Sequence, residues 1–247
     1  MQTYLADLPV HSHCFPPDLK GMSLAEVKNT WQKEKISIIV IFSLLFLLTH
    51  IIRDYYNTGW KYAAATTYGM TLVFAGWAFL KDITLVKKVL LFGVVAGILE
   101  LAIDWYVVDV VKVLVYAPGE PMILSSPLYM PLSWALMFLY IGYFSLILTE
   151  IKGLWLGIVG ATVGGMLFIP AFEYWAAKAG WWYYHSCKMI GPVPWFIICC
   201  EALVSFIMPV VMLQLNKRGY GFAVIAGTLQ GIWLFVSSFI SFHLIGR

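Results

Sequence analysis

The chain has 247 residues, of which 61% are hydrophobic and 12% are charged, and its mean hydropathy is +0.82. Soluble domains carry about 25% charged residues, so a soluble globular protein is excluded and a polytopic membrane protein is predicted. The net charge is only +3 and the basic residues form no stripe, which gives no support for binding to nucleic acid.

The N-terminal region, residues 1–35, is polar and precedes a transmembrane region over residues 36–247. A capping-box pattern begins at Ser23, and apolar residues that include Trp31 recur at helical spacing as far as Lys35. We therefore expect a short amphipathic helix that lies at the membrane surface. Because no apolar run precedes it, we also expect that no signal peptide is cleaved.

Seven apolar segments follow, each close to the roughly 20 residues that a helix needs to cross a bilayer. Short alternating strands, which a transmembrane barrel would require, are not visible. The pattern therefore predicts an all-α fold, a bundle of seven transmembrane helices. The expected helices are Ile36–Ile52, Tyr62–Leu80, Val89–Val111, Leu132–Leu148, Leu154–Ala176, Trp195–Leu215 and Phe222–Ile245.

The connections between these segments give an orientation, because cytoplasmic loops carry an excess of lysine and arginine. Ten such residues lie on the N-terminal side and six on the other side. The N-terminus is therefore predicted to be cytoplasmic and the C-terminus to lie outside. Two outer connections, Leu114–Pro131 and Gly180–Pro194, are long and contain prolines and aromatic residues, which is typical of a lid.

The third and fifth segments, with the loops after them, resemble each other. Asp104 in the first unit and Glu173 in the second are each followed by two aromatic residues. Each loop contains tyrosine and ends with two prolines and an aromatic residue at the start of the next helix. This favours a parallel internal duplication, which would bring the two acids to similar depth. The alternative is that such loops recur in aromatic-rich membrane proteins.

Four carboxylates lie inside apolar segments: Glu100, Asp104, Glu173 and Glu201. A charge in hydrocarbon costs several kcal/mol, so such residues usually face an interior cavity and have a function. At a rise of about 1.5 Å per residue, all four fall in the outer half of the membrane beneath the two loops. Burial favours the protonated form of a carboxylic acid, which can protonate an alkene or an epoxide.

We predict that Asp104 and Glu173 are the proton donor and its partner, and that Glu100 and Glu201 tune them or take a proton back. Aromatic faces nearby could stabilise the resulting carbocation, although each ring could instead belong to the interfacial belt. The predicted substrate-binding residues are Trp105, Tyr129, Trp134, Tyr174, Trp175, Trp182 and Trp195.

Neither a metal nor a cofactor is predicted. His50 with Asp54, His185 and His243 fall toward the outer face and could add ligands to the acids, but no HxxxH or HExxH spacing occurs. No DDxxD-type run is present to hold Mg²⁺ on a diphosphate. The four cysteines form no CxxC pair and are expected to pack as small apolar residues.

The chain resembles small membrane-embedded isoprenoid enzymes, namely the lycopene cyclase-like and carotenoid hydratase-like proteins and the fungal meroterpenoid cyclases. The resemblance covers roughly residues 60–215. It lies in Glu100, Asp104, Glu173, the YAPGEP…SPLYMPLSW loop and the GWWYY…GPVPW loop. It implies acid-initiated cyclisation or hydration of a polyprenyl chain, without a metal or a diphosphate site.

Three functions are compatible with these features. The leading hypothesis is an integral-membrane enzyme whose partners are a lipophilic isoprenoid or carotenoid-like substrate and membrane lipids. The alternative is a proton-coupled transporter, for which Gly164, Gly165, Pro170 and Pro209 are candidate helix breaks. The third is a scaffold whose aromatic residues bind lipid or pigment.

Overall fold

The computed structural model describes residues 24–56 and 59–247, and side chains from Lys33 onward except those of residues 50, 51 and 53–58. Helices dominate this part of the chain, which confirms the all-α prediction. The helices are α1 (Leu24–Tyr56), α2 (Trp60–Leu80), α3 (Thr84–Trp105) with the π-helical turn η2 (Tyr106–Val110), α4 (Met130–Lys152), α5 (Leu154–Lys178), α6 (Trp195–Phe206), α7 (Met208–Lys217), and α8 (Tyr220–Ser241) with the π-helical turn η3 (Phe242–Gly246).

The first helix differs from the prediction of a separate surface helix, because α1 continues without a break past Lys35. Neither proline nor glycine lies between Leu24 and Thr49, so the sequence does not interrupt the helical hydrogen bonds there. Its 33 residues span about 50 Å, which exceeds the hydrocarbon core of about 30 Å. The side chain of Trp31, predicted to lie in the interface, is outside the described residues.

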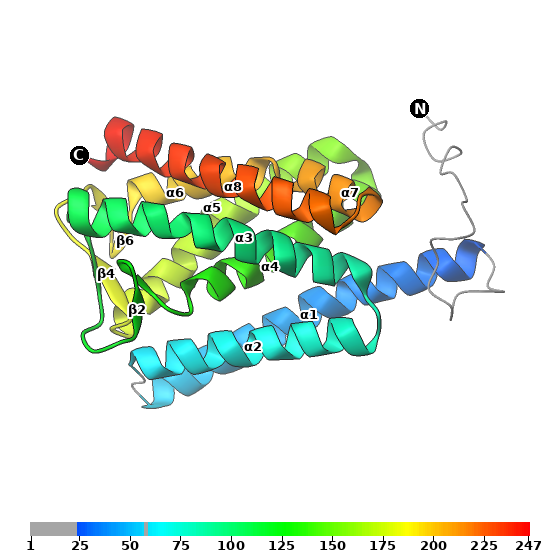
Figure 1. Cartoon of the computed structure of the whole chain (residues 1–247), viewed down its shortest axis with the longest axis horizontal. Coiled ribbons are helices and arrows are strands. Elements are labelled where there is room, and N and C mark those ends of the chain that lie inside the picture. The colour runs from blue at the N-terminus through cyan, green and yellow to red at the C-terminus, as the bar shows by residue number, and fades with distance from the viewer. Residues whose placement is uncertain (1–23, 57–58) are drawn as a thin grey trace.

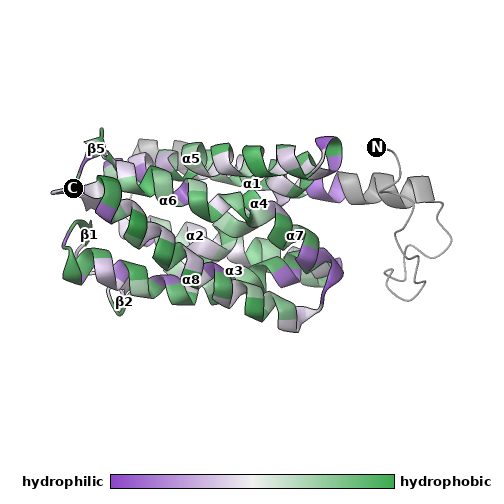
Figure 2. Ribbon diagram, turned by 90° about the horizontal axis from the view of Figure 1, so that it is seen from above, coloured by the Kyte–Doolittle hydropathy of each residue, from purple (hydrophilic) through white to green (hydrophobic). Residues whose placement is uncertain are grey.

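Five helical rods in the described part of the chain are long and apolar enough to cross a membrane: α2, α4, α5, α6 with α7, and α8 with η3. This confirms that the protein is a membrane protein. Helix α3 has 22 residues and packs among these rods, although it carries four charged side chains. Hydrophobic residues cover most of the bundle, and hydrophilic residues gather toward its two ends (Figure 2).

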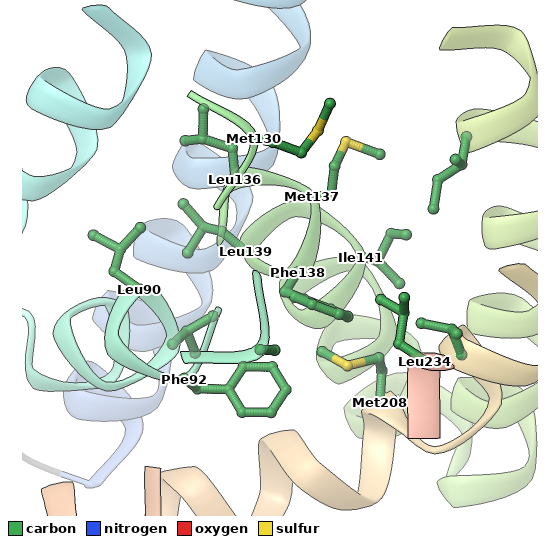
Figure 3. Packing of buried hydrophobic residues seen from close by; sticks show 14 of the residues in the cluster. Leu90, Phe92, Met130, Leu136, Met137, Phe138, Leu139, Ile141, Met208 and Leu234 are labelled. Carbon is green, nitrogen blue, oxygen red and sulfur yellow. The ribbon is translucent and has the colours of Figure 1, made fainter. Parts of the chain in front are cut away.

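Helices α3, α4, α5, α6, α7 and α8 form the main bundle, and α1 and α2 lie along one side of it as a hairpin (Figure 1). The core surrounds α4, where Phe138 and Leu139 are buried beside Phe92, Met208 and Leu234 (Figure 3). Burial of this continuous apolar cluster holds the helices together inside the molecule, whereas the outward faces stay apolar for contact with lipid.

Two glycines allow close helix contacts near the cavity described below. A Cβ added to Gly97 of α3 would lie 2.6 Å from the carbonyl oxygen of Pro131 on α4. A Cβ added to Gly165 of α5 would lie 2.8 Å from the carbonyl oxygen of Glu201 on α6. Small residues of this kind are typical of contacts between transmembrane helices.

The two long connections fold over the end of the bundle where the C-terminus lies (Figure 1). We call residues 111–129 the first lid and residues 179–194 the second lid. Strand β1 of the first lid pairs antiparallel with β4 of the second, and each lid adds a small hairpin of its own. The strands are β1 (Leu114–Tyr116), β2 (Met122–Ile123), β3 (Ser126–Pro127), β4 (Trp182–Tyr184), β5 (Met189–Ile190) and β6 (Val193–Pro194).

The candidate helix breaks behave differently from one another. Pro170 and the pair Gly164–Gly165 lie inside α5, which continues through them. The sixth predicted segment divides at Ile207 into α6 and α7, two residues before Pro209. Proline is tolerated in the first turn of a helix, so Pro209 can begin α7 but cannot continue α6.

Candidate functional site

An internal cavity lies beneath the lids, between α3, α4, α5, α6 and α8. Its volume is about 70 Å³, enough for a few water molecules. The wall is largely apolar, yet all four predicted acids line it. The lining residues are Glu100, Ile103, Asp104, Val107, Tyr116, Met130, Ser133, Trp134, Met137, Ile169, Phe172, Glu173, Trp182, Tyr184, Ile197, Cys200, Glu201, Leu234 and Ser238.

Asp104 is the most strongly hydrogen-bonded of the four acids. Its Oδ2 accepts a hydrogen bond from the Tyr116 hydroxyl at 2.5 Å and another from the Ser126 hydroxyl at 2.5 Å. A side-chain hydrogen bond also links it to Glu100, one helical turn earlier on α3. Several donors on one carboxyl group favour its ionised form, which offsets part of the cost of burying it.

The other acids differ in their partners. Oε2 of Glu173 accepts a hydrogen bond from the Trp182 indole at 2.6 Å. Oε2 of Glu100 and Oε2 of Glu201 are buried, and no described residue donates a hydrogen bond to either. Glu173 interacts electrostatically with both Asp104 and Glu201, so the four acids form one electrostatic group.

The paired strands of the two lids carry side chains that donate hydrogen bonds to the acids. Tyr116 on β1 lies directly opposite Trp182 on β4, with ring centroids 5.9 Å apart. Burial and the adjacent Asp104 carboxylate raise the pKa of Tyr116 well above its ordinary value. Tyr116 therefore stays protonated and remains a donor. Burial and the nearby acids have the same effect on the pKa of Tyr184.

The cavity wall repeats itself along the chain. Seven pairs of lining residues, one member before residue 135 and one after residue 168, are separated by 67 to 69 positions. This regular offset supports the predicted parallel duplication, and the antiparallel pairing of β1 with β4 fits a local two-fold relation. The pairs are Glu100 and Ile169, Ile103 and Phe172, Asp104 and Glu173, Tyr116 and Tyr184, Met130 and Ile197, Ser133 and Cys200, and Trp134 and Glu201.

The predicted substrate-binding residues divide into three groups. Trp134 and Trp182 line the cavity with the acids, and Tyr129 lines a second cavity next to it. Trp105 and Trp195 are exposed outside the cavity. The remaining two of the seven, at positions 174 and 175, also lie outside it.

Helix geometry explains why the aromatic neighbours of the acids do not face the cavity. Consecutive helical residues point about 100° apart, so Tyr174 turns away from the cavity that Glu173 lines. Tyr174 is exposed and stacks beneath the Lys178 ammonium. Trp175 packs against Phe46 of α1, with ring centroids 5.6 Å apart.

Two important site residues were missed in the sequence, Tyr116 and Tyr184. Both belong to the tyrosine-containing loops that the repeat comparison noted, so their matching positions were the available signal. Ser126 was missed as well, because a serine in a loop carries no distinctive pattern. Three-residue strands such as β1 and β4 are too short to show alternation.

His185 and His243, two of the histidines considered as ligands, do not join the acids. His185 and His243 are exposed, and neither lines the cavity. The side chains of His50 and Asp54 lie outside the described residues. Within the described residues, no group of three or more histidine, cysteine, aspartate or glutamate side chains is placed to hold a metal ion.

The fold and the cavity together define a class, an all-helical membrane protein with four carboxyl groups in one largely apolar cavity. The chain belongs to the family described as Domain of unknown function (DUF6989), which matches residues 101–245. This stretch includes Asp104, Glu173 and Glu201, and Glu100 lies immediately before it. No curated protein and no solved structure matches the chain.

Proposed function

We propose that this protein is an integral-membrane enzyme that acts on an isoprenoid or carotenoid-like lipid by acid-initiated cyclisation or hydration. The observation that carries the proposal is the gathering of four carboxyl groups from three helices in one cavity with aromatic walls. Such groups are costly in a membrane and mark functional sites. The resemblance to membrane-embedded isoprenoid enzymes agrees with this chemistry.

The contacts favour a division of roles among the acids. Asp104 and Glu173 accept hydrogen bonds from the lids and are suited to hold negative charge. Glu100 and Glu201 have an unpartnered buried oxygen, which favours the neutral, proton-bearing form. We therefore assign proton donation to Glu100 or Glu201, whereas the sequence alone pointed to Asp104.

The proposed step begins when the donor O–H protonates a carbon–carbon double bond or an epoxide oxygen, which leaves a carboxylate and a carbocation. The charge of Asp104 and the ring faces of Trp134 and Phe172 stabilise the cation. In cyclisation, another double bond attacks the cation and a carboxylate recovers a proton, so the product is an isomer. In hydration, water adds to the cation and its released proton restores the acid.

We further infer that the chain crosses the membrane seven times with a cytoplasmic N-terminus. Helices α1 and α3 lie alongside the five apolar rods and are long enough to join them (Figure 1). The charge bias of the connections supports the orientation, with the lids and the C-terminus outside.

A proton-coupled transporter is the second candidate. Two observations favour it: the cavity has a volume of only about 70 Å³, which suits a small cation or water, and the sixth segment is broken between α6 and α7. An enzyme with a larger substrate requires side chains or helices to move apart before the substrate can reach the acids.

The test uses the full chain in lipid nanodiscs, supplied with linear polyprenyl alkenes and with their terminal epoxides in D₂O. Deuterium incorporation together with a cyclic isomer or a hydrated product, detected by mass spectrometry, supports the enzyme. A variant with both Glu100→Gln and Glu201→Gln is the control and is expected to form no product. Lack of conversion, combined with proton-dependent cation uptake by proteoliposomes, favours the transporter.

A further inference from the structure

A second cavity lies between the α1–α2 hairpin and the main bundle. It has a volume of about 50 Å³, and its wall on the hairpin side includes Phe42 and Phe46 of α1 and Met70 of α2. This wall is mainly apolar and partly aromatic, with Thr49, Thr66 and Thr67 among its residues, as expected for a site that holds a hydrocarbon chain.

The two cavities share part of their walls. Ser133 and Met137 of α4, Phe172 of α5 and Trp182 of the second lid line both of them. The rings of Phe172 and Trp182 lie 5.6 Å apart and are tilted against each other. Side chains therefore separate the two spaces, and no helix of the described chain lies between them.

The second cavity also has a polar edge. Tyr129 lines it and is 4% exposed, and the Glu120 carboxyl group lies beside the Tyr129 hydroxyl. The buried oxygens of both groups lack a well-formed hydrogen bond within the described structure. Glu120 also interacts with the Ala117 backbone. Because unsatisfied buried polar groups cost about 1–3 kcal/mol each, a ligand hydroxyl group that hydrogen-bonds to Tyr129 and Glu120 would be stabilised at this edge.

We propose that the second cavity binds the remote end of an elongated isoprenoid alcohol, with its hydroxyl group at Tyr129 and Glu120. The inference rests on the proposed function, because the reactive end of the same molecule would lie among the four acids. The chain between the two ends passes the shared wall at Met137 and Trp182. Neither cavity, nor the two together, is large enough for such a molecule as they stand, so binding requires the α1–α2 hairpin to move away from the main bundle, and each end of the ligand then has its own environment.

The position of this cavity also indicates how the ligand arrives. The β1–β4 pair covers the end of the bundle, whereas the α1–α2 hairpin borders the second cavity from the side. Outward-facing residues of the hairpin, such as Leu44 and Leu72, are exposed for contact with lipid. A lipid-soluble substrate therefore reaches the second cavity from the bilayer when the hairpin moves outward, and its reactive end then passes to the acids.

The test uses geranylgeraniol that carries a photoreactive diazirine next to its hydroxyl group, with the full chain in nanodiscs. Cross-linked positions are mapped by peptide mass spectrometry, and affinity is measured by competition with unmodified geranylgeraniol. Thr67→Trp fills the second cavity and is expected to weaken binding at least tenfold. Leu72→Trp, on the exposed face of the same helix, is the matched control and is expected to bind as the parent does.

The polar edge is tested separately with Tyr129→Phe. This variant is expected to bind the alcohol about tenfold more weakly, the effect of one lost hydrogen bond to a buried group. It should bind the corresponding hydrocarbon, which lacks the hydroxyl group, with unchanged affinity. Tyr220→Phe, at an exposed tyrosine outside both cavities, is the control for the loss of a hydroxyl group.

The outcomes separate this inference from the proposed function. Saturable cross-links to second-cavity residues, lost in Thr67→Trp but kept in Leu72→Trp, support the inference. Cross-links confined to the acid cavity, with normal binding by Thr67→Trp, overturn it and leave the proposed function in place. Absence of saturable labelling in both cavities overturns the proposed function itself.

Discussion

The two predicted repeat units share the same order of helix, lid and helix, but they carry their acids at different positions. The first unit consists of α3, the first lid and α4, and the second consists of α5, the second lid and α6. In each, an acid on the first helix accepts a hydrogen bond from a lid, as Asp104 does from Tyr116 and Glu173 does from Trp182. An acid hydrogen-bonded to a lid is therefore a feature that the two units share.

The remaining two acids have no counterpart in the other unit. Glu100 of the first unit corresponds to Ile169, and Glu201 of the second corresponds to Trp134. These two are also the acids with an unpartnered buried oxygen. The comparison teaches that the repeated acids accept hydrogen bonds from the lids, whereas each unrepeated acid keeps one buried oxygen without a partner in the described structure. Four predictions test this distinction.

The largest effect is expected for the unrepeated acids. Glu100→Gln and Glu201→Gln each keep the size of the side chain but remove the acidic proton. We expect one of them to lower turnover by about 10²–10⁴-fold, the usual contribution of a general acid. Product formation in nanodiscs measures it, and a normal thermal unfolding profile establishes that the fold is intact.

The matched control for this prediction is Asp109→Asn. Asp109 lies in η2, which continues α3, and is exposed, with a hydrogen bond from Ser125. Its loss should leave turnover within a factor of two or so, because a solvent-exposed pair contributes little. Equal loss of activity in Asp109→Asn and Glu100→Gln would contradict a specific role for Glu100 in proton donation.

The next largest effect is a difference in stability between variants of the two repeated acids. Asp104→Asn disturbs two hydroxyl donors, and Glu173→Gln disturbs one indole donor. We expect Asp104→Asn to lower the free energy of unfolding by about 1–3 kcal/mol, and Glu173→Gln by less, because fewer buried partners lose an acceptor. Chemical denaturation in detergent micelles compares them, and a greater loss for Glu173→Gln would contradict the assignment.

A smaller effect is expected at the donors themselves. Tyr116→Phe and Trp182→Phe each remove one hydrogen bond to an acid but leave the β1–β4 backbone pairing in place. Each should cost about 1 kcal/mol of stability and reduce turnover by roughly tenfold or less. Tyr183→Phe, on the same strand with an exposed side chain, is the control and should behave as the parent chain does.

The smallest effect is expected in the pH dependence of stability, which should differ between the two lids. Burial raises the pKa of Glu120 in the first lid from its ordinary 4.5 to about 7. The folded protein therefore binds this proton more tightly than the unfolded chain does. The stabilising contribution is fully present below pH 4.5 and is lost as the pH rises through about 7.

Between pH 5 and 8 the melting temperature of Glu120→Gln should therefore decrease less than that of the parent chain. Differential scanning fluorimetry can measure both. Cys187 is a titratable residue of the second lid, and burial raises the pKa of its thiol, which therefore stays neutral in this range. Cys187→Ser should leave the slope unchanged. An unaltered slope in Glu120→Gln would exclude Glu120 as its source.

Most of the fold could be predicted from the sequence, because membrane helices are recognisable as apolar runs of the required length. The acids could be placed in one cavity for a related reason, since helical rise and direction fix the depth of each residue. The boundary between α6 and α7 was less clear, because Pro209 can either kink a helix or begin a new one.

The details of the site could not be predicted in the same way. Proximity in sequence suggested Trp105 and Tyr174 as substrate contacts, but neighbours on a helix face different directions. The partners of the acids come from lids whose pairing depends on contacts between residues nearly 70 positions apart, such as Tyr116 and Trp182. A single sequence carries no local signal for such a contact.

The short ladder between β1 and β4 has a consequence for the whole site. Tyr116 and Trp182 are cross-strand neighbours, and successive strand residues point to opposite faces. A slip of one residue would turn both side chains away from the acids together. Three pairs of residues thus set the alignment on which two buried carboxylates depend. The side chain of Val115 lies outside the cavity, but proline at this position would remove a backbone donor from the ladder. Val115→Pro would therefore disturb the hydrogen bonds of Asp104 and Glu173 together.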